Sequence, residues 1–72
     1  MDKAVEILDV VALMEDLPPH GLYRGQVGTV VESLAPHVFE VEFSDNEGRT
    51  YASLALEAGQ LMILRHEPGE VA

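Results

Sequence analysis

The chain of 72 residues contains no cysteine and no tryptophan. The absence of cysteine excludes disulfide bonds and thiolate metal sites. No apolar stretch approaches the roughly 20 residues that a membrane-spanning helix needs. Residues 1–4 also lack the basic leader and the apolar core of a signal peptide. We therefore expect a cytoplasmic protein with no membrane partner.

Basic residues are also scarce, since four lysines and arginines stand against thirteen aspartates and glutamates, for a formal charge of −9. The four are scattered along the chain as Lys3, Arg24, Arg49 and Arg65. Nucleic-acid binding draws most of its affinity from such residues at phosphates. We therefore do not expect a nucleic-acid partner. The negative electrostatic field of the chain would instead attract a basic protein.

The chain is long enough for one domain and one core. Apolar residues make up 47% of the sequence, and only four of them are aromatic. A chain of this size buries roughly 60% of the surface that its unfolded form exposes. A second copy could cover part of the remaining apolar surface, so self-association stays open.

Five short segments have the composition of β-strands: residues 9–14, 27–34, 38–43, 49–56 and 61–64. The clearest is residues 38–43, where Phe39, Val41 and Phe43 share one face and Glu40 and Glu42 the other. We expect the apolar face to point inward. The first segment is ambiguous, because apolar positions 4, 7, 8, 11 and 14 also fit a helix; we favour the strand.

The connections carry turn signals. Residues 15–21 predict a loop with an extended path through its proline pair. Gly25 and Gly28 predict a tight corner before a strand, and Gly48 ends a hairpin loop over residues 44–48. Residues 57–60 suit one short helical turn.

Together these elements predict an all-β fold, a small five-stranded SH3-like barrel with one short helical turn before the last strand. We expect a single domain over residues 1–72. Its folded part runs from about residue 7 to 65, and residues 66–72 form a frayed tail.

The order of motifs resembles a small bacterial family known only as a domain of unknown function (domain of unknown function 4926). The resemblance runs from about Leu8 to Leu64 and rests on residues 8–13, 15–18, 21–22, 24–25, 27–31, 39–43 and 48. It implies an SH3-like barrel and a stand-alone bacterial protein, and it implies no activity. Residues 24–30 also have a weaker similarity to the KOW motif of ribosomal and transcription-elongation proteins, which implies a contact with RNA or protein.

No residue set forms a catalytic or metal-binding signature. The histidines, His20, His37 and His66, lie in three separate loop or tail contexts. The glycines open a strand and lack the Lys-Ser/Thr of a nucleotide loop. The pair Glu40 and Glu42 is expected to be a solvated strand face or an interaction surface. We therefore expect no enzyme, no cofactor and no metal.

The composition instead predicts an acidic interaction module that docks onto a basic protein. Carboxylates such as Glu15, Asp16, Glu40 and Glu42 would steer the encounter, and an apolar patch near Leu22 and Tyr23 would hold the contact. Tyr23 and Tyr51 could also line a peptide groove. An antitoxin, immunity-like or regulatory role fits this prediction. The alternative is a KOW-type module of translation or transcription that contacts RNA or ribonucleoprotein.

Overall fold

A computed structural model of the chain describes residues 4–65. The predicted tail, residues 66–72, lies outside the described residues. The structure contains five strands and two 3₁₀ turns: β1 (Val10–Leu13), η1 (Pro18–His20), β2 (Val27–Ala35), β3 (Val38–Ser44), β4 (Thr50–Glu57), η2 (Ala58–Gln60) and β5 (Leu61–Ile63). The strand prediction for residues 9–14 is confirmed, and the helical alternative is wrong.

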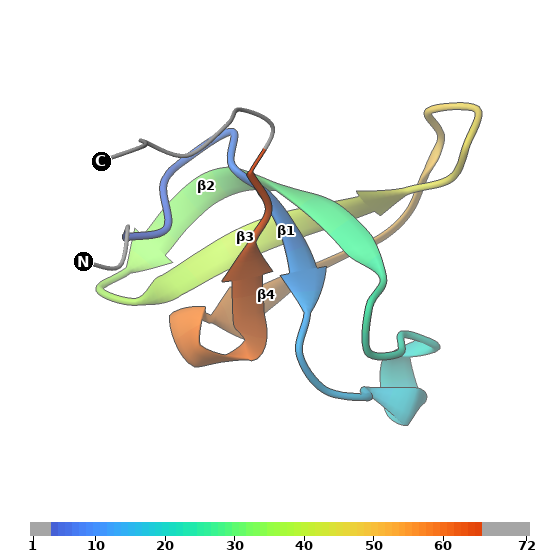
Figure 1. Cartoon of the computed structure of the whole chain (residues 1–72), viewed down its shortest axis with the longest axis horizontal. Helices are drawn as coiled ribbons and strands as arrows, with labels where there is room; N and C mark the ends of the chain where they lie inside the picture. Colours follow the sequence, from blue (N-terminus) through green and yellow to red (C-terminus); the bar gives the residue numbers. More distant parts are fainter. Residues whose placement is uncertain (1–3, 66–72) are drawn as a thin grey trace, which may run out of the picture.

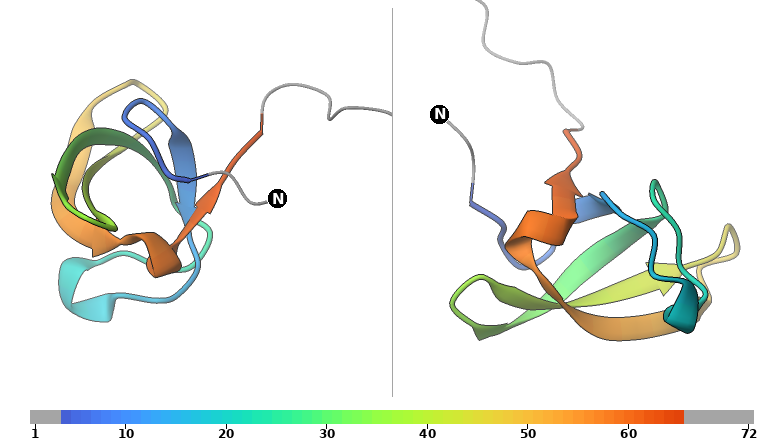
Figure 2. Two further views of the ribbon diagram at one scale, coloured as in Figure 1. Left: turned by 90° about the vertical axis from the view of Figure 1, so that its left-hand side faces the viewer. Right: turned by 90° about the horizontal axis from the view of Figure 1, so that it is seen from below.

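The strands form one antiparallel sheet in the order β4-β3-β2-β1-β5. Figure 1 shows the sheet strongly twisted, and the left view of Figure 2 shows its strands curving around one interior. The turn η2 leads from β4, at one end of the order, to β5, at the other. The predicted all-β barrel with one helical turn before its last strand is confirmed.

The core lies inside the curved sheet. Phe39 is 8% exposed, and Val41 and Phe43 are fully buried, so the predicted inward face of β3 is confirmed. β-strand alternation places every second side chain of the neighbouring strands on the same side. The remaining core residues are Val11, Leu13, Leu22, Val30, Leu56 and Leu61.

The pairing of β2 with β3 is interrupted twice. The register shifts between Val30 and Glu32 and again between Ser33 and Ala35. Each extra residue in one strand bends it and increases its twist. These bulges let a long two-stranded ribbon curl around a small core.

Two of the three predicted turn glycines take left-handed backbone conformations, Gly25 with φ +94° and Gly48 with φ +81°. The third prediction is wrong, because Gly28 lies within β2 and is not a turn residue. A Cβ at this position would lie 2.8 Å from the Glu42 carbonyl oxygen and 2.8 Å from Val41 Cγ1. Glycine is needed there because β3 approaches closely.

The loop over residues 15–21 is confirmed, but its proline pair does not follow an extended path. Leu17 has a non-helical backbone, as expected before a proline. Pro18 and Pro19 then open the 3₁₀ turn η1, which ends at left-handed Gly21. Proline fits the first turn of a helix because its fixed φ is helical and its missing N–H has no partner there.

Candidate functional site

Three carboxylates share the outer face of β2 and β3. Glu40 and Glu42 alternate with the buried residues of β3, so they point away from the core. Glu32 of β2 lies directly opposite Glu40 in the register. Directly opposite residues share a face, so Glu32 joins the other two. We call Glu32, Glu40 and Glu42 the acidic row.

Hydroxyl groups of β4 contact this row. Ser53 Oγ donates a hydrogen bond to Glu40 Oε1 at 3.2 Å, and Thr50 Oγ1 approaches Glu42 Oε1 at 3.5 Å. Glu40 and Glu42 are half-buried, and Glu32 is exposed. Among residues 4–65, no lysine or arginine forms an ion pair with the row. Its negative charge is therefore not neutralised by the part of the chain that the structure describes.

The prediction for Glu15 and Asp16 concerns a different element, the loop after β1. Both side chains are exposed. Asp16 Oδ1 accepts the backbone N–H of Arg24 at 2.8 Å, which ties this loop to the turn that carries Tyr23. Arg24 is the one cation between residues 21 and 28. The turn that resembles a KOW motif is therefore faced by a carboxylate and holds little positive charge.

The predicted apolar patch near Leu22 and Tyr23 needs a correction. Leu22 is fully buried and belongs to the core, where it also forms a bridge with Leu17. It cannot contact a partner. Tyr23 is 52% exposed and Tyr51 is 49% exposed. Tyr23 is therefore the exposed member of the predicted patch, and Tyr51 is a second exposed aromatic side chain.

Gln26 joins the two tyrosines. Its side-chain oxygen accepts the backbone N–H of Tyr23, and its Nε2 donates to the Tyr51 hydroxyl at 3.0 Å. Tyr51 follows Thr50, whose hydroxyl approaches Glu42. A chain of hydrogen bonds and adjacent residues therefore runs from the Asp16 loop to the acidic row.

Sequence reasoning missed Glu32 because of a bulge. Strict alternation from buried Gly28 and Val30 would turn Glu32 inward. The register shift after Val30 adds one residue and turns Glu32 outward, opposite Glu40. A charged residue at an expected inward position is the signal that could have revealed the bulge.

The two described histidines lie in separate elements. His20 lies in η1, and His37 lies between β2 and β3 with a left-handed backbone, φ +64°. His66 lies outside the described residues. Residues 4–65 contain no group of three or more histidine and carboxylate side chains that could hold a metal ion. Over the same residues, no helix has the length and apolar character to cross a membrane.

Comparison with known proteins identifies the family. The sequence model of the family described as "Domain of unknown function (DUF4926)" matches residues 7–63, so the chain belongs to that family. No curated protein and no solved structure gives a significant match to the chain.

Proposed function

We propose that this protein is a non-enzymatic interaction module that docks onto a basic protein surface through the outer face of β2, β3 and β4. The observation that carries the proposal is the acidic row. Glu32, Glu40 and Glu42 share one face, and no cation of residues 4–65 pairs with them. Like charges placed opposite each other destabilise a sheet. The acidic row therefore lowers the stability of the free protein. A partner that neutralises these charges explains why the protein carries them.

The net charge also attracts a basic partner at long range. A formal charge of −9 on 72 residues attracts a cationic surface over distances of about one Debye length. Such steering raises association rates by about 10- to 1,000-fold. Glu15 and Asp16 contribute to this field from their loop, whereas the acidic row provides the short-range contacts.

The tyrosines supply the second part of the contact. Tyr23 and Tyr51 each present a half-exposed ring beside the polar residues that lead to Glu42. Tyrosine is enriched in protein interfaces because it combines apolar area with a hydroxyl group. Arginine side chains suit this surface, since a guanidinium can pair with a carboxylate and stack on an aromatic ring. The proposed partner is therefore arginine-rich, and neutralising such a protein fits an antitoxin, immunity-like or regulatory role.

Capture from a lysate of the encoding organism tests the proposal with two charge-matched variants. Glu40→Gln/Glu42→Gln and Glu6→Gln/Glu67→Gln each remove two negative charges, but only the first pair lies in the acidic row. We expect the wild type and the second variant to retain a basic protein at low salt, and the first variant to lose it. Equal retention by all three would refute the acidic row as the contact. Tight RNA binding in a low-salt filter assay would favour the KOW-type alternative instead.

A further inference from the structure

β5 is the last strand in the sheet and pairs only with β1. The hydrogen bonds next to this strand establish which of its backbone groups face β1. Leu64 N–H donates to the Val10 carbonyl at 2.8 Å, and Met14 N–H donates to the Gln60 carbonyl at 2.9 Å. Antiparallel pairs alternate between bonded and non-bonded positions. Met62 therefore directs its N–H and its carbonyl toward β1.

The intervening residues face the other way. Ile63 directs its N–H and its carbonyl to the open edge, and Leu61 directs its carbonyl there. The Leu61 N–H is already used, since it donates to the Ala58 carbonyl. Within residues 4–65, no hydrogen bond uses the outward groups of Ile63. By the same alternation, Arg65 N–H is the next outward donor.

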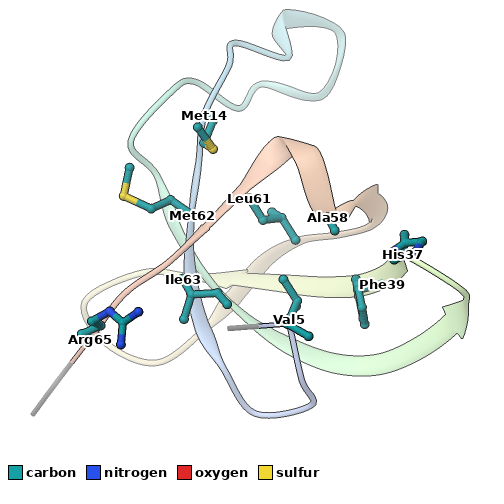
Figure 3. A pocket seen from close by; sticks show the side chains of 10 residues that line it. Val5, Met14, His37, Phe39, Ala58, Leu61, Met62, Ile63 and Arg65 are labelled. Carbon is teal, nitrogen blue, oxygen red and sulfur yellow. The ribbon is translucent and has the colours of Figure 1, made fainter. Parts of the chain in front are cut away.

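A cleft lined mainly by apolar residues, together with His37 and Arg65, lies beside this edge. It has a volume of about 520 Å³, and Val5, Phe39, Leu61 and Ile63 are among its lining residues. Figure 3 shows their side chains gathered next to β5, with Met62 directed away from them. Within the part of the chain that the structure describes, no residue that lines the cleft is acidic.

We propose that this edge binds a second copy of the chain, with β5 pairing antiparallel to β5 about a two-fold axis at Ile63. Each Ile63 N–H then donates to the Ile63 carbonyl of the other copy. Each Arg65 N–H donates to the Leu61 carbonyl opposite it. This pairing uses the outward groups of the edge and does not need the Leu61 N–H. A two-fold interface requires such a self-complementary set.

The charges favour a second copy at this edge over other faces. Two chains of −9 repel each other, and the acidic row would place carboxylates against carboxylates. Among residues 4–65, no carboxylate lines the cleft beside β5, so two acidic chains meet there with less repulsion than at the acidic row. Pairing would also cover exposed apolar surface beside the edge, where Met14 is 48% and Met62 is 51% exposed. A free strand edge is a ready site for such pairing.

Sedimentation equilibrium over a concentration series tests the proposal with two matched pairs of variants. Arg65→Pro removes the proposed Arg65 N–H donor and the side-chain charge, whereas Arg65→Ala removes only the charge. Two backbone hydrogen bonds lost per dimer predict a dissociation constant about thirty-fold higher for the proline variant. Equal constants for the two would contradict the proposed pairing.

The second pair keeps the test valid if the proline variant fails to fold. Met62→Glu and Tyr51→Glu add the same charge at positions of similar exposure, 51% and 49%, on strands at opposite ends of the sheet. We expect Met62→Glu to weaken the dimer by at least about ten-fold, because it sets carboxylates of both copies near the axis. Tyr51→Glu should leave it unchanged. A wild-type chain that stays monomeric, or equal effects of the two substitutions, would overturn the proposal.

Salt separates this inference from the proposed function. Added salt screens repulsion between two acidic copies, so it should strengthen the dimer. The same salt should weaken docking onto a basic partner. Failure of one therefore leaves the other standing.

Discussion

Gly28→Ala is the substitution whose effect the structure specifies most closely. A Cβ at Gly28 would lie 2.8 Å from the Glu42 carbonyl oxygen, 2.8 Å from Val41 Cγ1 and 3.0 Å from Phe43 Cδ1. Val41 and Phe43 are fully buried, and the Glu42 carbonyl is part of β3. None of the three is the free end of a flexible side chain, so the two strands must separate.

Two opposing terms give the expected magnitude. Replacing a strand glycine by alanine stabilises by about 0.5–1 kcal/mol, because the unfolded chain loses conformational freedom. Overpacking a well-packed interior costs about 1–3 kcal/mol or more. Because the added Cβ would make three close contacts, we expect an overpacking cost at the upper end of this range. We expect a net loss of about 2 kcal/mol from a free energy of unfolding of about 4–11 kcal/mol.

Urea unfolding followed by far-UV circular dichroism measures this loss. A decrease of about 2 kcal/mol corresponds to a Tm lower by about 8–16 °C. Gly59→Ala is the matched control, since no atom lies within 4 Å of its added Cβ. Its free energy of unfolding should rise by about 0.5–1 kcal/mol, because the same loss of freedom in the unfolded chain meets no steric clash in the folded one. Gly28→Ala unfolding at the wild-type midpoint would refute the close approach of β3 to β2.

Two further predictions concern the surface loops. Leu22→Ala should lower the free energy of unfolding by about 2–5 kcal/mol, because Leu22 is fully buried. Tyr23→Ala should lower it by less than about 1 kcal/mol in the same urea experiment, yet weaken partner capture; equal losses would contradict their assignment to core and surface. Asp45→Ala should cost about 1–2 kcal/mol, because Asp45 Oδ1 accepts the N–H groups of Glu47 and Arg49 at 2.9 and 3.0 Å. Asp45→Asn keeps an acceptor oxygen and should retain most of that stability; thermal melts that rank the two variants equally would argue against this role.

The strands were predictable where side-chain pattern and turn chemistry agree. The alternation of Phe39, Val41 and Phe43 determines which face of β3 enters the core, and the left-handed Gly48 ends the hairpin that follows. Residues 4–14 were ambiguous because β-branched and helix-forming residues are mixed there. This segment forms strand β1 because it pairs with β2 and β5. The sequence of the segment alone does not show which strands pair with it.

The errors come from tertiary contacts. Gly28 was predicted as a turn residue, but the approach of β3 is what requires glycine there. Leu22 was predicted to belong to an apolar surface patch with Tyr23, yet its loop folds back and buries it. Glu32 was overlooked because the bulge that turns it outward depends on pairing with β3. Glu40 and Glu42 were placed correctly because local alternation alone decides their face.

The most direct test of the proposed docking surface is the association rate constant of the captured basic partner, measured by stopped flow across a salt series. We expect Glu40→Gln/Glu42→Gln to slow association and to flatten its salt dependence more than Glu6→Gln/Glu67→Gln does, although both variants carry the same net charge. Identical rates and salt slopes for the two variants would show that net charge alone attracts the partner, and would contradict a contact at the acidic row.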